Sequence, residues 1–144
     1  MKVSTKGRYG LRSLVYLAVH SSDGHVPLAA IAEGEGISFN YLEQVFAILR
    51  KAGIVKSIKG SQGGYVLPND PSRIKVIDII RVLEGDYNIS EEKEDRNITQ
   101  EALDNVLWSK INEAVNSIFK NTTLEDLVNE YKRLNNMSYD MYYI

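Results

Sequence analysis

The sequence predicts a mainly α-helical fold that carries one small β-hairpin. Three observations support this prediction. Apolar residues recur at three- and four-residue steps in several separate stretches, a glycine-rich segment is flanked by short β-branched runs, and a long apolar face extends for about six helical turns in the second half of the chain. With 144 residues, of which 44% are hydrophobic, the chain can bury a real core.

Three helices are expected in the first third of the chain. Ser4 or Thr5 can cap the first of them, because short polar side chains accept hydrogen bonds from free backbone N–H groups at a helix start. Pro27 begins a second, shorter helix, which ends at the two glycines of residues 34–36, and Ser38 caps a third. The second and third helices, joined by a tight turn, form a helix-turn-helix.

A hairpin and a fourth helix follow. Residues 54–58 are β-branched and alternating, residues 59–64 form a glycine-rich turn, and residues 65–67 are a returning strand. Apolar positions from Ile74 to Leu83 then mark a fourth helix that ends at Gly85.

The second half of the chain begins with a polar, acidic segment and continues with two helices. Apolar residues in the range 99–120 predict one long helix, and Thr123 with Asp126 forms a capping-box-like start for the last one. The final residues, 138–144, show neither a cap nor a clear period. We therefore expect two helices followed by an irregular tail.

The charge is divided along the chain. Residues 1–81 hold 11 Lys and Arg against 6 Asp and Glu, a net charge of +5, whereas residues 82–144 hold 6 against 13, a net charge of −7. A basic front half on a protein with a net charge of −2 suits a module that meets a polyanion. Chance segregation of solvated faces would give the same division.

Several classes of function lack support in the sequence. The absence of cysteine removes disulfides, thiolate metal sites and cysteine nucleophiles. There is no HExxH motif, no Walker loop and no Ser/His/Asp arrangement that the spacing justifies, so we do not expect an enzyme. The longest apolar run, Leu14 to Val19, is too short to cross a membrane, and the first residues do not resemble a signal peptide, so we expect a cytoplasmic protein.

A helix-turn-helix followed by a basic, glycine-rich hairpin is the winged helix-turn-helix plan. In this plan the second helix offers side chains to base edges in the major groove, while flanking elements contact phosphates. The candidate base-reading residues are Ser38, Asn40, Tyr41, Glu43 and Gln44. The other candidate DNA-binding residues are Lys56, Lys59, Ser61 and Gln62 in the hairpin and Lys2, Arg8 and Tyr9 near the start of the first helix, where Lys6 and Arg12 are further donors.

Glycines in the hairpin support the same interpretation. Gly60, Gly63 and Gly64 permit positive φ and leave no side chains between the backbone and a sugar-phosphate wall. The alternative is a solvated helix face beside an ordinary hairpin turn, which explains the glycines but not the flanking lysines.

The long helix of the rear half is a candidate dimerisation element. Its apolar face is more easily buried against a partner than within so small a domain. The residues of this face are Leu103, Leu107, Ile111, Val115 and Ile118. Packing within the chain, against the first helix, is the alternative.

Several segments, in this order and spacing, resemble the bacterial Rrf2 family of winged-helix repressors. They are STKGRYGL (4–11), ISFNYLEQ (37–44), KAGIVKS (51–57) and GGYVL (63–67), followed by IIRVLEG (79–85), LW (107–108) and TTLEDL (122–127), so the resemblance covers nearly the whole chain. It implies a homodimer on a pseudo-palindromic operator with half-sites about one helical turn apart. We divide the chain into a winged helix-turn-helix DNA-binding domain (1–85), an acidic loop (86–98), dimerisation helices (99–137) and a C-terminal tail (138–144).

Many members of this family hold an iron-sulfur cluster on three cysteines between the fourth helix and the dimerisation helix. This chain has no cysteine and carries the acidic run 91–95 there, so thiolate ligation is impossible and we expect no cofactor and no metal. A site made of carboxylates is conceivable, but a solvated loop is the simpler interpretation. His20 and His25 lack an obvious third ligand, which favours a surface or turn role for both.

The aromatic C-terminus is similar to that of the family's cysteine-metabolism branch. Repressors of this branch work with cysteine synthase (O-acetylserine sulfhydrylase), whose cleft accepts a C-terminal isoleucine carboxylate. The resemblance implies that Tyr142, Tyr143 and Ile144 form such a docking peptide. A tail that packs on its own dimer or frays is the alternative. A second hypothesis for the whole chain is a protein-interaction regulator that acts mainly by binding a metabolic enzyme.

Overall fold

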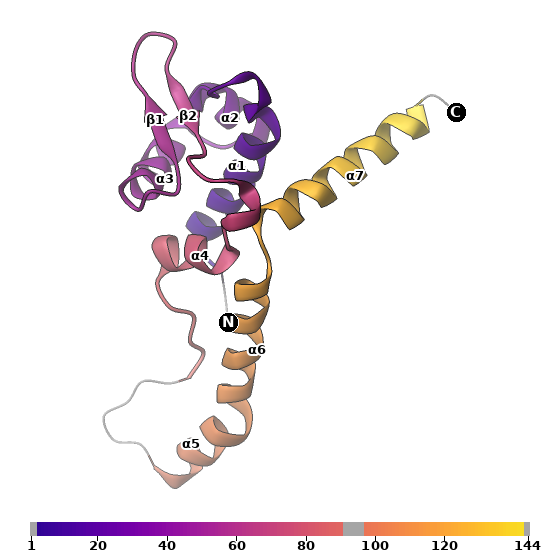
Figure 1. Ribbon diagram of the computed structural model, residues 1–144. Coiled ribbons are helices and arrows are strands. Elements are labelled where there is room, and N and C mark those ends of the chain that lie inside the picture. The colour runs from indigo at the N-terminus through magenta and orange to yellow at the C-terminus, as the bar shows by residue number, and fades with distance from the viewer. Residues whose placement is uncertain (1–2, 91–96, 143–144) are drawn as a thin grey trace.

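The computed structural model describes residues 3–90 and 97–142, while the side chains of residues 23 and 139–142 lie outside the description. In this part of the chain the structure is mainly helical with one two-stranded antiparallel sheet, as the sequence predicts (Figure 1). The front half contains α1 (Thr5–His20), a 3-10 turn (Ser21–Asp23), α2 (Leu28–Glu35), α3 (Phe39–Lys51), β1 (Lys56–Ile58), β2 (Gly64–Val66), a 3-10 turn (Pro71–Arg73) and α4 (Val76–Glu84). The rear half contains α5 (Ile98–Leu103), a π-helical segment (Asp104–Trp108), α6 (Ser109–Asn121) and α7 (Leu124–Tyr142).

The first three helices begin and end close to the predicted positions. The Ser4 hydroxyl accepts a hydrogen bond from the Gly7 amide at 3.3 Å and so caps α1. Helix α2 ends at Gly36, whose φ of 65° is the left-handed conformation that glycine adopts without steric cost. Helix α3 begins three residues later, at Phe39, so α2 and α3 form the helix-turn-helix.

One core joins the helices of the front half. Its fully buried side chains include Leu14 of α1, Ile31 of α2, Phe46 of α3 and Ile79 of α4. Each such side chain contributes about 1.5–3 kcal/mol relative to its exposed state. Helix α7 of the rear half adds Leu124, which is also fully buried, together with Val128.

The hairpin is attached to the helix-turn-helix through the segment before α2. Val26 and Tyr65 exchange two backbone hydrogen bonds of 2.9 Å, and the Tyr65 ring packs against Phe46 of α3 with 4.8 Å between ring centroids. The strands are shorter than predicted, because Ile54 is still bonded to the end of α3 through Leu49. The hairpin therefore stands in a fixed position beside α3 (Figure 1).

Two of the hairpin glycines are required by the fold itself. A Cβ atom on Gly63 would collide with the backbone carbonyl of Ile58, and one on Gly64 would lie 2.5 Å from the carbonyl oxygen of Val26. Only Gly60, with φ of 123°, lies in open space. Close packing within the chain thus accounts for Gly63 and Gly64, so these glycines are not evidence for a nearby sugar-phosphate wall.

The rear half extends away from the front half as two long helical segments (Figure 1). The π-helical segment joins α5 to α6 without a break, so the predicted helix 99–120 is present with a local change of register. Thr123 and Asp126 form the predicted reciprocal cap of α7 through bonds of 2.9 and 3.2 Å. None of the helices in the described part of the chain is both long and apolar enough for a bilayer-crossing segment.

Helix α7 is longer than the sequence pattern indicates. It continues through Tyr142, into the segment for which we expect an irregular tail. No glycine or proline occurs between Thr123 and Tyr142, so nothing in the sequence stops a helix once its capped start has formed.

Candidate nucleic-acid interface

Helix α3 presents two different faces. Leu42, Val45, Phe46 and Leu49 are buried in the core, whereas the predicted base-reading residues Asn40, Glu43 and Gln44 are exposed. Gln can form a bidentate pair with adenine, and Glu can accept a hydrogen bond from the N4 amino group of cytosine. The exposed face of α3 therefore carries groups that can read base edges.

The start of α3 combines a cap with an exposed aromatic ring. The Ser38 hydroxyl accepts a hydrogen bond from the Tyr41 amide at 3.4 Å, so this predicted DNA-binding side chain also caps the helix. Phe39, which the sequence reasoning missed, is 46% exposed at the first helical position. Its spacing from Leu42 and Phe46 is that of a core residue, so only the structure shows that its ring remains accessible. An accessible ring at this position can contact a thymine methyl group.

Tyr9 and Tyr41, both predicted DNA contacts, are half-buried and touch each other. Their rings meet edge to face with 5.8 Å between centroids, which fixes α1 against α3. Arg12 lies over the Tyr9 ring at 5.2 Å and bonds to Glu35, with 3.1 Å between Nε and Oε1. Arg12 therefore ties α1 to the end of α2, while 48% of its side chain remains exposed.

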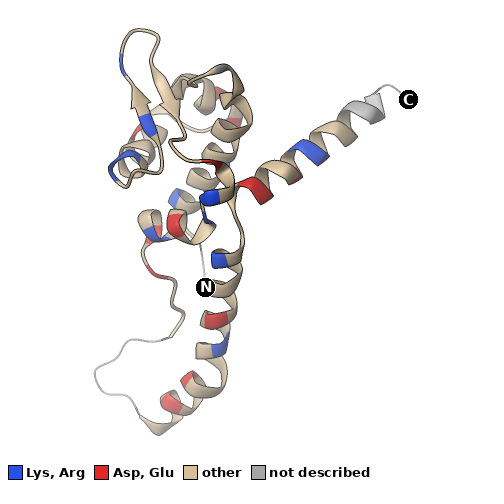
Figure 2. Cartoon of the chain, in the orientation of Figure 1, with Lys and Arg blue, Asp and Glu red and all other residues tan. Residues whose placement is uncertain are grey.

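The hairpin exposes all four of its predicted DNA contacts. Lys56 lies on β1, and Lys59, Ser61 and Gln62 lie in the turn between the strands. Ile58 at the end of β1 is also exposed, as a second apolar side chain that sequence reasoning did not assign. In Figure 2 the basic positions of the hairpin lie on the same side as those at the end of α3, which are Arg50 and Lys51.

A carboxylate anchors the start of α1. The Ser4 amide donates to Glu84 of α4 at 2.5 Å, and the Ser4 hydroxyl also donates to Glu84. Negative charge at a helix N-terminus is favourable, because the free N–H groups and the helix dipole are positive there. Arg8 is exposed and donates to the Val3 carbonyl at 3.0 Å, whereas Lys2 lies outside the described residues.

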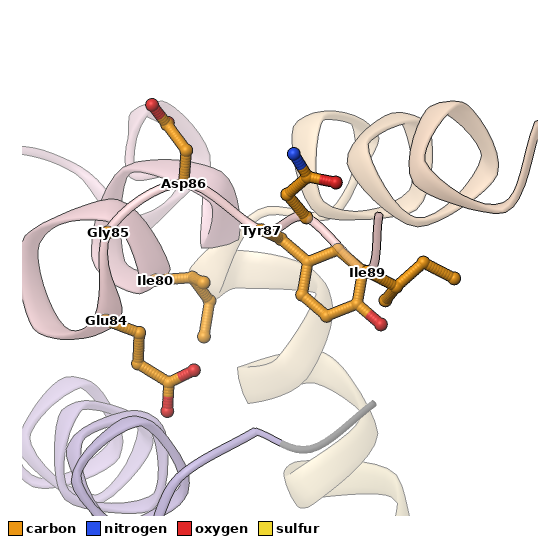
Figure 3. Close-up of a pocket in the computed structure, with 7 residues that line it drawn as sticks. Ile80, Glu84, Gly85, Asp86, Tyr87 and Ile89 are labelled. Atoms are coloured by element: carbon orange, nitrogen blue, oxygen red, sulfur yellow. The ribbon is translucent and has the colours of Figure 1, made fainter. Parts of the chain in front are cut away.

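A cavity of about 370 Å³ lies beneath the end of α4 (Figure 3). The Glu84 side chain is directed from it toward α1, where Ser4 binds the carboxylate. Asp86 forms an ion pair with Arg81, with 3.1 Å between Oδ1 and Nε. Both acidic side chains of the cavity are therefore engaged by neighbouring residues.

The predicted dimerisation face is only partly covered within the chain. Ile111 and Val115 are half-buried, Leu103 and Leu107 are exposed, and Ile118 is 64% exposed. Val106 and Ile98 on the same long helix are more exposed still, at 67% and 85%. The side chain of Tyr142 and all of Tyr143 and Ile144, the predicted docking residues, lie outside the described part.

The donor set does not fit an iron-sulfur cluster. The sequence contains no cysteine, and within residues 3–90 and 97–142 no three His, Asp or Glu side chains gather in a metal-binding arrangement. The acidic run 91–95, the conceivable carboxylate site, falls outside the described residues. His20 stacks on Tyr16, and His25 binds the hairpin, so these two histidines serve separate local contacts.

A helix-turn-helix with an attached basic hairpin defines a winged-helix DNA-binding transcriptional regulator. The hairpin, residues 56–66, is the wing. The Rrf2 family model, described as an iron-dependent transcriptional regulator, matches residues 3–130. The chain belongs to the Rrf2 family, which confirms the resemblance drawn from the sequence motifs.

Individual relatives agree with this assignment. The chain is 47% identical to the HTH-type transcriptional regulator CymR of Bacillus subtilis over 88% of its own length and 89% of that protein. It is 40% identical to the HTH-type transcriptional regulator IscR of Yersinia enterocolitica over 90% of its own length and 80% of the relative. These relatives are named as transcriptional regulators and not as enzymes, as the sequence analysis expects.

Solved structures show the same fold. The structure of CymR (YrzC), the global cysteine regulator of B. subtilis, superposes with a TM-score of 0.80 at 45% identity, covering 90% of this chain and 98% of that one. Staphylococcus aureus CymR gives a TM-score of 0.71 at 40% identity, covering 87% of this chain and 96% of that one.

The two roles of Ser38 can be separated by substitution. Ser38→Ala removes the cap of α3 and should lower the free energy of unfolding by about 1 kcal/mol. Ser38→Asp keeps a capping oxygen, so it should retain stability but weaken DNA binding through repulsion from phosphates. Urea unfolding and DNA titration of both variants provide the measurements. Equal DNA affinity in Ser38→Asp and the wild type would exclude Ser38 from the DNA-facing surface.

Proposed function

We propose that the protein is a homodimeric repressor of cysteine or sulfur metabolism genes that works in the cytoplasm without an iron-sulfur cluster. The observation that carries the proposal is the exposed face of α3 beside a lysine-bearing wing. A helix in the major groove reads bases, and cations on the wing contact the neighbouring backbone. The similarity to B. subtilis CymR, a global cysteine regulator, supports the choice of target genes.

An unfilled apolar surface supports the homodimer. Next to the exposed face of the long helix is a groove of about 310 Å³, lined by apolar residues of α6 and by Val3, Arg8 and Tyr87. The Tyr87 ring packs edge to face on Phe119 at 6.0 Å, and its hydroxyl is buried with no hydrogen-bond partner among the described residues. A second copy, packed with its long helix across this surface, would cover the apolar face.

The proposal of a cluster-free regulator follows from the donor set. Thiolates normally hold iron-sulfur clusters, and this sequence has none. Part of the acidic loop is instead held on α6 by Asn112, whose side-chain oxygen accepts from the Ile89 amide at 2.9 Å and whose nitrogen donates to Asn88 at 2.8 Å. Hydrogen bonds within the chain thus fix residues 88–90.

DNA binding should depend on the wing and on α3 in different ways. Lys59→Ala removes a phosphate contact, so it should weaken binding to all sequences and reduce the slope of log K against log salt by about 1. Gln44→Ala should cost about 1–3 kcal/mol at the operator and relax base preference at one position. Titrations of operator fragments at several salt concentrations measure both effects.

Lys132→Ala, on the exposed side of α7, is the matched charge control and should leave binding unchanged. The operator fragments come from genomic DNA retained by the protein, and we expect them upstream of sulfur-assimilation genes. Enrichment elsewhere would refute the cysteine assignment. If no specific fragment is retained while a metabolic enzyme co-purifies, the protein-interaction regulator is the better description.

Dimer formation should depend on the exposed face of α6. Ile118→Glu places a charge on a surface that is already exposed in one chain, so the fold should persist while the dimer weakens. Sedimentation equilibrium should show a shift toward monomer, and operator affinity should fall because two half-sites are no longer bound together. Lys120→Glu, two residues away and also exposed, is the control; an unchanged dimer in Ile118→Glu would contradict this interface.

The proposed partner, cysteine synthase, should bind through the C-terminal residues Tyr142, Tyr143 and Ile144. An apolar end with a free carboxylate suits a pocket lined by backbone N–H groups. Helix α7 extends through Tyr142, so the proposed docking peptide begins in its last turn. Deletion of the last four residues should abolish binding to cysteine synthase in a titration while leaving DNA binding intact, and unchanged enzyme binding would reject the docking role.

A further inference from the structure

We infer that His25 is a positioning residue that holds the wing turn in the orientation needed to contact DNA. The imidazole Nε2 of His25 lies in hydrogen-bonding contact with the backbone carbonyl oxygen of Gln62. His25 precedes α2, and Gln62 lies in the turn between β1 and β2, so this bond links two segments 37 residues apart in the chain. The inference rests on the proposed contact of the wing with DNA.

In the described part of the chain the hairpin has one other hydrogen-bonded attachment to the segment before α2, and that attachment lies at the middle of β2. It is the pair of backbone bonds between Val26 and Tyr65. The last ladder pair, Ile58 with Gly64, comes before the turn, and inside the turn the Gly63 amide bonds to the Gly60 carbonyl at 3.1 Å. The His25 contact therefore fixes the turn relative to the helices beyond the point where strand pairing ends.

The chemistry of this bond suits a fixed support. A carbonyl oxygen only accepts, so Nε2 must carry the proton and donate it. Both the neutral Nε2–H tautomer and the doubly protonated ring provide this donor, so the bond does not require one charge state. Because the acceptor is the backbone of Gln62, the side chain of Gln62 remains exposed and free to reach DNA, as does Lys59.

Immobilising the turn before DNA arrives favours binding. A free turn would lose conformational entropy when its lysine is placed on the phosphate backbone, and a turn already held in position loses less. His25→Ala should accordingly weaken operator binding by about three- to tenfold, the equivalent of one net hydrogen bond. Because the bond is at the surface, the thermal midpoint should stay within about 3 °C of the wild type.

Two variants separate the hydrogen bond from other effects of the substitution. His25→Gln places an amide N–H close to the position of Nε2 and should restore most of the affinity. His20→Ala is the matched control, since His20 is also exposed. It stacks on Tyr16 and bonds to the Tyr16 carbonyl at 2.9 Å, away from the hairpin. This control should bind the operator like the wild type.

A readout without DNA tests the positioning itself. Amide hydrogen exchange of residues 59–63 in the free protein should accelerate in His25→Ala and not in His25→Gln or His20→Ala. With operator DNA, His25→Ala should have a smaller effect when Lys59→Ala is already present, because positioning of that lysine no longer contributes to binding. The inference would be overturned if the two substitutions had fully additive effects on the free energy of operator binding. It would also be overturned if amide exchange of residues 59–63 were unchanged in His25→Ala.

The same experiment distinguishes failure of this inference from failure of the proposed function. If Lys59→Ala weakens operator binding and His25→Ala does not, the wing contacts DNA without help from His25, and the inference is wrong. If neither substitution affects binding although exchange is faster in His25→Ala, the wing contact of the proposed function is wrong, and the DNA role of His25 is rejected with it.

Discussion

The pairing of Val26 with Tyr65 determines where the wing lies relative to the reading helix. Two bonds of 2.9 Å join the segment before α2 to β2, and the Tyr65 ring continues the contact onto Phe46 in the core. A hairpin with three residues in each strand would be marginal on its own. The hairpin is therefore stabilised by its attachment to the helices more than by its own strand pairing. Gly64 is needed for this attachment, because any side chain there would collide with the Val26 carbonyl.

The two halves of the chain differ in how completely they bury their apolar residues. In the front half the apolar faces of α1, α3 and α4 meet in one core. In the rear half, Val106 and Ile118 remain exposed on the long helix, and Leu134 and Met137 remain exposed on α7. This division coincides with the charge division, so the basic half carries the candidate DNA contacts and the acidic half carries the exposed apolar surface.

The elements of the fold follow from local signals and could be predicted. Caps at Ser4, Ser38 and Thr123 and the glycine stop at Gly36 act within one or two turns, so the sequence contains them directly. The exposed face of α3 follows from the same periodicity. The length of α7 was missed because residues 132–138 are all exposed and so lack the apolar pattern on which a helix prediction depends.

The contacts between distant residues could not be predicted. The charge of Arg12 suggests a phosphate contact, and only the structure shows that this residue also joins α1 to α2, through its distance of 3.1 Å from Glu35. The exposure of Phe39 and the bond of His25 to Gln62 likewise depend on how α2, α3 and the hairpin are placed. The sequence analysis explained Gly63 and Gly64 by the close approach of a sugar-phosphate backbone. In the structure, their close neighbours are backbone carbonyl groups of the same chain.

Helix α7 makes the stable unit of the front half discontinuous in the sequence. Leu124 is completely buried beside α1, and backbone bonds of 2.9 and 2.8 Å join Val76 to Thr122 and Leu124 to Ile74. A fragment excised at residue 85 would keep every candidate base-reading residue and yet have a cavity in its core in place of Leu124 and Val128. The junction of α6 and α7 is bonded through its backbone to the chain between the hairpin and α4, so the two halves of the chain cannot be separated at a single cut without breaking these bonds.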